Sequence, residues 1–167
     1  MHESAKLAMS GKYIGQIIRK GVVIDEFDFD NLVVDQGLNY ALNASFGQTT
    51  ALTGWYIGLF EGNYTPVAGV TAATIAGLAT ETTAYTSATR PAWTTVASTA
   101  KSLTNGASRA SFTFNATKTI YGAFLVSSST KSGTSGTLFS AARFTTAKSV
   151  DTDDELLITY VLTAADA

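Results

Sequence analysis

The chain contains no cysteine and a single histidine. Without cysteine it can form neither a disulfide framework nor a thiolate nucleophile. The one histidine, His2, lies in a segment that we expect to be an arm, so a His-based metal site or catalytic triad would need a second chain. We therefore expect a protein that is not an enzyme, with no catalytic residue, no cofactor and no metal.

Charged residues are also scarce. They make up 14% of the 167 residues, whereas hydrophobic residues make up 46%; an ordinary soluble domain has about 25% charged residues. Thr, Ser and Asn could supply a neutral polar surface, or part of the surface could be buried against partners. We expect both. The length suits one domain with a core of its own.

The few charges are unevenly distributed along a chain of net charge −2. Residues 36–150 carry seven basic and two acidic groups, residues 1–35 carry four basic and six acidic ones, and the tail from Asp151 carries five acids and no base. We favour neutralisation by proximity in the fold over head-to-tail contact between subunits through complementary patches. With no global basic field, we expect no nucleic-acid partner.

Long apolar runs are absent as well. No stretch approaches the length of about 20 residues that a membrane span needs, so we expect no membrane partner. Residues 1–11 contain no apolar core of a signal peptide. We expect them to form a flexible N-terminal arm in front of a single domain at 12–167.

Alternation of apolar and polar residues predicts strands over most of that domain. Lys20-Gly21 reads as the turn of a hairpin between the first two strands. Two further strands are apolar on both faces, which is typical of strands covered on both sides. The strands are expected at 12–20, 22–29, 55–60, 110–117, 119–126, 137–144 and 156–163.

One short α-helix is expected near residues 36–46. Asp35 is a candidate N-cap, and Gly47 stands where a left-handed residue commonly ends a helix. The spacing of the apolar residues at i, i+3, i+4, i+7 and i+8 predicts one stripe toward the core. That stripe consists of Leu38, Ala41, Leu42, Ser45 and Phe46.

Short strands between Gly/Ser/Thr/Asn turns, together with one helix, predict a mainly β fold. We expect an antiparallel β-sandwich, of which a jelly roll is one form. A long Ala/Thr-rich excursion is expected at 61–92, and one helical turn could lie near Ala72–Leu78. Loops this long inside a compact domain are usually functional or ordered by a partner.

Acidic residues are the remaining candidates for chemistry. Two clusters could supply oxygen ligands to calcium, but neither has the Gly and distal Glu of a calcium loop, so we interpret both as solvated turn or strand-edge charges. A glycosidase needs only two carboxylates, yet Glu61 and Glu81 lie in Thr-rich sequence that would not raise a pKa. The clusters are Asp25, Glu26, Asp28 and Asp30, and Asp151, Asp153, Asp154 and Glu155.

Aromatic residues could form a stacking platform for sugars or a contact surface for a protein. Trp55 lies within an apolar strand, where core packing is the commoner outcome, and Tyr56 follows it. Aromatic residues and arginine anchor many protein interfaces, and Arg90-Pro91-Ala92-Trp93 is the most anchor-like stretch. The candidate partner-interface residues are Tyr64, Tyr85, Arg90 and Trp93.

Five segments resemble a recurring type of small tailed-bacteriophage virion protein. Together they suggest a strand entering a short helix, a W-Y-x-G-L strand, a T-x-Y-x-x-x-T-R-P-x-W segment and a G-x-F-L strand before a Gly/Ser/Thr loop. They are DNLVVDQGLNYAL (30–42), WYIGLFEGNYTPVA (55–68), ATETTAYTSATRPAW (79–93), IYGAFLVSSSTKSGTSGTLFSAARF (120–144) and LLITYVLTA (156–164).

The resemblance implies a head or tail accessory part of a virion, most similar to a capsid cement or decoration protein. Such a protein would be made in the cytoplasm of the host bacterium and would sit on the head surface of the particle. It would bind the major capsid protein and act in many copies, as a homo-oligomer on the particle. The alternative is a receptor- or glycan-binding module of the tail.

Overall fold

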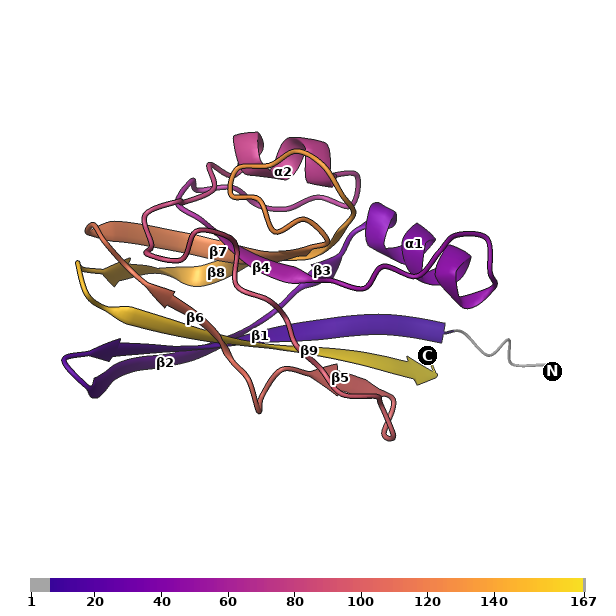
Figure 1. The fold of residues 1–167 in the computed structure, drawn as a ribbon, viewed down its shortest axis with the longest axis horizontal. Coiled ribbons are helices and arrows are strands. Elements are labelled where there is room, and N and C mark those ends of the chain that lie inside the picture. Colours follow the sequence, from indigo (N-terminus) through magenta and orange to yellow (C-terminus); the bar gives the residue numbers. More distant parts are fainter. Residues whose placement is uncertain (1–6, 167) are drawn as a thin grey trace.

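The computed structural model describes residues 7–166 and shows a mainly β, sandwich-like fold of two antiparallel sheets and two helices (Figure 1). The predicted fold class is therefore confirmed. In chain order the elements are β1 (Leu7–Arg19), β2 (Val22–Asp30), β3 (Leu32–Val33), α1 (Asp35–Ser45), β4 (Tyr56–Phe60), α2 (Ala72–Leu78), β5 (Ser102–Thr104), β6 (Ala110–Thr113), β7 (Lys118–Val126), β8 (Leu138–Val150) and β9 (Glu155–Asp166).

The two sheets divide the strands between them. In the first sheet the order is β2-β1-β9, and β5 and β6 both pair with the other side of β9. In the second sheet the order is β3-β8-β7-β4. Both β1–β2 and β7–β8 are hairpins within one sheet, which is a more local connectivity than the two Greek keys of a jelly roll.

The predicted first hairpin is present. Lys20 and Gly21 have φ angles of 51° and 79°, and two successive positive φ values are those of the type I′ turn that suits the twist of paired strands. The register shifts between Ile17 and Ile18, which face Asp25 and Val23. Ile24 is therefore the extra residue of a β-bulge beside the turn.

The prediction of an arm at 1–11 is wrong for residues 7–11. Residues 7–11 belong to β1 and pair with β9, from Leu7 opposite Asp166 to Gly11 opposite Leu162. This end of β1 contributes only Met9 to the packing against the core, and its backbone hydrogen bonds to β9 hold it in place. Residues 1–6, including His2, lie outside the described residues.

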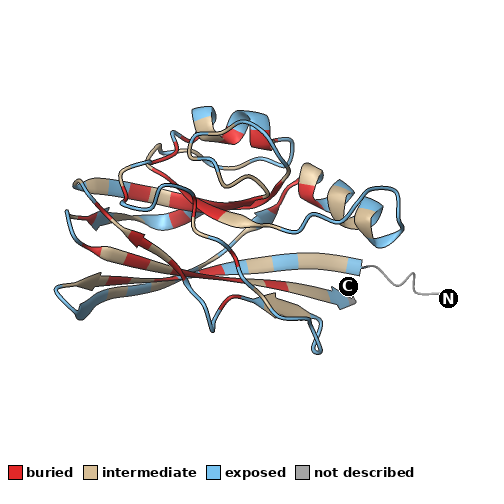
Figure 2. Cartoon of the chain, viewed as in Figure 1, coloured by how far each residue is buried: buried red, intermediate tan, exposed pale blue. Residues whose placement is uncertain are grey.

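The core has two parts, one on each side of the second sheet. The larger part fills the space between the sheets and includes Tyr13, Phe112 and Phe144. The smaller part lies between the second sheet and the excursion with α2, and includes Phe60 and Phe124. Figure 2 shows buried residues in both layers, which agrees with the prediction that β4 and β7 are covered on both faces.

The predicted helix is α1, but its orientation differs from the prediction. Its N-cap is Val34, and Gly47 has the expected positive φ of 71°. Gly37 is buried so close to β8 that a Cβ there would collide with the Phe139 carbonyl oxygen. The helix therefore packs through its small-residue side, and Ala41 alone of the predicted stripe contacts the core.

Candidate contact surfaces

Three of the four predicted interface residues are buried within the chain. Tyr85, Arg90 and Trp93 are 2%, 1% and 9% exposed, so they do not form an outward contact surface. Tyr64 is partly exposed and packs against the smaller core. The predicted anchor is thus corrected: its aromatic and arginine side chains stabilise this fold rather than an exposed surface.

Arg90 holds the excursion to the loop between β7 and β8. Its Nε and Nη2 donate to the two carboxylate oxygens of Glu81 at 2.8 and 2.7 Å, and both side chains are fully buried. Nη1 donates to the carbonyl of Ser128 at 2.8 Å, and Nη2 also donates to that of Gly133 at 3.2 Å. A bidentate pair with these extra acceptors offsets the cost of burying two charges.

Lys131, in the same loop between β7 and β8, binds Tyr85 of the excursion. Its ammonium donates to the carbonyl of Tyr85 at 2.8 Å and lies 3.7 Å from the centre of the Tyr85 ring. Burial lowers the pKa of Lys131, and the charge of Glu81 partly opposes this. Burial is also the main cause that raises the pKa of Tyr85. The excursion at 61–92 is therefore a fixed layer of the fold.

Most residues of the two acidic clusters are paired with basic, amide or hydroxyl side chains. Lys148 lies 2.9 Å from Asp25, Lys12 lies 2.6 Å from Asp28, and Arg19 binds both Asp151 and Asp154. In residues 7–166 no group of three or more His, Cys, Asp or Glu side chains is placed to hold a metal ion. These ion pairs support neutralisation of the uneven charges within the fold. Of the two central acids, Glu61 pairs with Lys118 and Glu81 with Arg90.

Asp154 is expected to make stability depend on acid pH. Hydrogen bonds from Arg19, at 2.9 and 2.6 Å, lower the pKa of Asp154 below its ordinary 3.8, although burial opposes the shift. Because the folded state favours the carboxylate, its contribution is present above about pH 4 and is lost as the pH falls through the lowered pKa. Asp154→Asn should lower the free energy of unfolding by roughly 1–3 kcal/mol at pH 7.

Urea unfolding at pH 7 and at pH 2.5 measures this effect. The difference between wild type and Asp154→Asn should shrink at pH 2.5, and an equal difference at both pH values would contradict the assignment. Asp153→Asn changes an exposed carboxylate one residue away and should stay within about 0.5 kcal/mol of wild type at pH 7.

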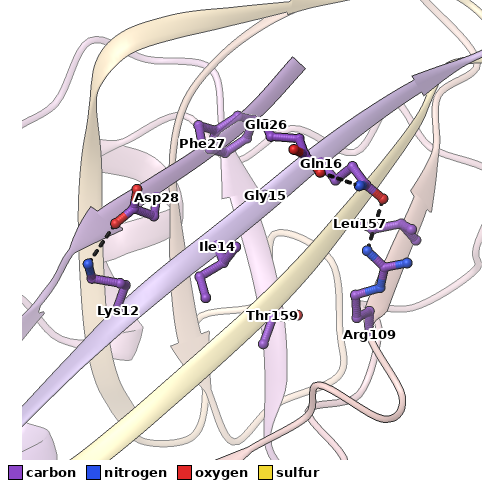
Figure 3. Close-up of a pocket in the computed structure, with 10 residues that line it drawn as sticks. All are labelled: Lys12, Ile14, Gly15, Gln16, Glu26, Phe27, Asp28, Arg109, Leu157 and Thr159. Atoms are coloured by element: carbon purple, nitrogen blue, oxygen red, sulfur yellow. Dashed lines mark hydrogen bonds and ion pairs between the residues drawn. The ribbon is translucent and has the colours of Figure 1, made fainter. Parts of the chain in front are cut away.

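The outer face of the first sheet carries neither helix, because both lie on the side of the second sheet (Figure 1). Figure 3 shows that its polar side chains bind one another. Lys12 donates to Asp28, Gln16 donates to Glu26, and Arg109 donates to Gln16 at 3.0 Å. The bond to Asp28 is the main cause that raises the pKa of Lys12. This open face presents a solvated, mutually bonded set of polar groups around Ile14.

One exposed apolar surface lies on α1. Leu38, Leu42 and Phe46 follow at i, i+4 and i+8, which places them on one side of the helix, and they are 38%, 55% and 75% exposed. No charged residue occurs between Gln36 and Phe60. We call these three side chains the α1 surface. The spacing of apolar residues predicts that these side chains face the core, and that prediction is wrong. Gly37 is the signal in the sequence that the other side of the helix can approach the sheet.

A second exposed apolar surface lies at the turn of the first hairpin. Val22, Val23 and Ile24 are 62%, 45% and 46% exposed. The bulge at Ile24 interrupts the alternation that would otherwise turn every second side chain inward. We call these three residues the hairpin tip. Figure 1 shows it and α1 at opposite ends of the molecule.

Comparison with known protein families and with curated proteins finds no family and no protein that the chain matches. Neither described helix is long and apolar enough to cross a membrane.

Proposed function

We propose that the protein is a structural part of a bacteriophage particle that binds the assembled capsid and connects neighbouring capsid subunits. The observation that carries this proposal is the presence of two exposed apolar surfaces, the α1 surface and the hairpin tip, at opposite ends of one sandwich. A connecting protein needs separate contacts for separate neighbours, and this arrangement supplies two.

The chemistry of the two surfaces suits protein contact. Exposed apolar clusters on soluble domains often mark interaction sites, because covering them removes apolar area from water. Each surface is small, so each contact would be weak alone. On a lattice, however, the second contact forms at a high effective concentration, and weak contacts add to strong attachment. Many copies on the head surface of the particle would stabilise it in this way.

Co-sedimentation with mature capsids of the encoding phage tests the proposal. The double variant Leu42→Glu/Phe46→Glu places two charges on the α1 surface and should weaken binding by at least about tenfold, because two desolvated apolar contacts are lost. Leu78→Glu is the matched control, since Leu78 is also an exposed leucine, 57% accessible, but lies at the end of α2. It should bind as wild type does.

Two outcomes would contradict the proposal. One is that the wild-type protein fails to co-sediment with capsids. The other is that the double variant, shown to be folded by its circular dichroism spectrum, binds as tightly as wild type and the Leu78→Glu control.

A further inference from the structure

A groove opens beside α1, between the segment that leads into β4 and the segment that follows Trp93. Three aromatic rings and three threonines contribute to its walls, and none of its lining residues is charged. It is lined by Leu52, Thr53, Gly54, Trp55, Tyr56, Ala92, Trp93, Thr94, Thr95 and Leu103. It therefore combines flat apolar walls with neutral polar groups.

The aromatic walls are held in place by the core. The Trp55 ring makes edge contacts with Tyr40 and Phe139, with ring centres 5.3 and 5.5 Å apart. Trp93 donates its ring N–H to the carbonyl of Tyr160 at 3.0 Å, which fixes its orientation. Because Trp93 is only 9% exposed, a ligand would mainly meet the partly buried ring of Trp55. The core already holds that ring in place, and this lowers the entropy cost of the contact.

Several polar groups of the groove make no hydrogen bond within the described part of the protein. The structure shows no hydrogen bond, among the residues it describes, for the hydroxyls of Tyr56, Thr53, Thr94 and Thr95 or for the ring N–H of Trp55. Trp55 and Tyr56 line the groove and are only partly buried. Hydroxyls both donate and accept, whereas the indole only donates.

We propose that this groove binds a neutral saccharide. A sugar ring has apolar C–H faces that lie flat against aromatic rings, and hydroxyls around its rim that pair with neutral donors and acceptors. Convergent polar groups on mostly fixed aromatic walls are the usual make-up of a small-ligand site. With no cation in the lining, the groove has no charged group to pair with an acidic sugar. None of the lining residues belongs to the α1 surface or to the hairpin tip.

Binding to an array of neutral and sialylated oligosaccharides tests this inference, followed by tryptophan-fluorescence titration with the strongest neutral oligosaccharide. Thr94→Val/Thr95→Val keeps the shape of the groove but removes two hydroxyls. It should weaken binding by about five- to tenfold or more, since a hydrogen bond contributes about 0.5–1.5 kcal/mol. Thr65→Val, at an exposed threonine outside the groove, is the matched control and should bind as wild type does.

Three outcomes would overturn the inference: no neutral oligosaccharide binds, the sialylated ones bind more tightly, or the Thr94→Val/Thr95→Val variant binds as the Thr65→Val control does. Thermal unfolding of both variants shows whether they are folded. Because the two threonines lie outside the α1 surface and the hairpin tip, capsid co-sedimentation should be unchanged in both variants. Failure of saccharide binding is thereby distinguishable from failure of capsid binding.

Discussion

Replacing Arg90 by methionine is expected to lower the free energy of unfolding by about 3–5 kcal/mol, measured by urea denaturation. Among the residues that the structure describes, the change leaves the buried Glu81 carboxylate with only the Ser132 backbone N–H, at 2.9 Å, as a hydrogen-bond partner. It also removes the donors to the carbonyls of Ser128 and Gly133. Removing one partner of a buried ion pair costs this much because the remaining charge is unpaired in a medium that solvates it poorly.

Two further variants show whether the loss of stability in Arg90→Met comes from breaking the buried ion pair or from removing an arginine in general. Arg109→Met removes an exposed arginine that donates to Gln16, and should change the free energy of unfolding by no more than about 0.5 kcal/mol. Arg90→Met/Glu81→Leu removes both charges and should recover part of the stability that Arg90→Met loses. A cost below about 1 kcal/mol for Arg90→Met would show that the buried pair does not hold the excursion in place.

Replacing Asn105 by alanine is expected to cost about 2–4 kcal/mol of unfolding free energy. Asn105 lies between β5 and β6, where neither strand pairs with the middle of β9. Its side chain fills the gap: Nδ2 donates to the carbonyl of Ile158 at 3.1 Å, and Oδ1 accepts from the backbone N–H of Tyr160 at 2.8 Å. Alanine removes both bonds to the backbone of β9, and a buried backbone group that loses its partner costs roughly 1–3 kcal/mol.

Asn39→Ala is the matched control for that prediction, because Asn39 is exposed on α1 and should change the free energy by no more than about 0.5 kcal/mol. Amide hydrogen exchange gives a second measurement. In Asn105→Ala the N–H of Tyr160 should exchange faster, while amides of the second sheet keep their protection. An unchanged exchange rate at Tyr160 would mean that the side chain does not bridge the gap.

Most strands could be predicted from the sequence because their signals are local. The alternation in β9 and the run of apolar residues in β7 each depend on a few neighbouring side chains. The turn at Lys20-Gly21 depends on only these two residues. The fold class follows from these signals, because short antiparallel strands with apolar faces must pack sheet on sheet to bury them.

The burial of Arg90 could not be predicted in the same way. Its carboxylate partner is nine residues away in the sequence, and its carbonyl partners are 38 and 43 residues away. An exposed arginine and a buried, fully paired one look alike in a local stretch such as Arg90-Pro91-Ala92-Trp93. Only the tertiary arrangement tells them apart.

The orientation of α1 was missed for a related reason. Periodicity showed an apolar stripe, but it could not show that a closer approach was open to the opposite side of the helix. Gly37 and Ala41 allow α1 to approach β8 closely, and this leaves Leu42 and Phe46 outside. The structure therefore adds the α1 surface to the candidate site, as it adds the hairpin tip.

An electron cryo-microscopy reconstruction of the phage capsid carrying this protein tests most directly whether it connects neighbouring subunits. We predict that each copy places its α1 surface against one capsid subunit and its hairpin tip against a neighbouring one. Copies attached by one end only, or attached through the open face of the first sheet with both apolar surfaces in solvent, would contradict the proposal.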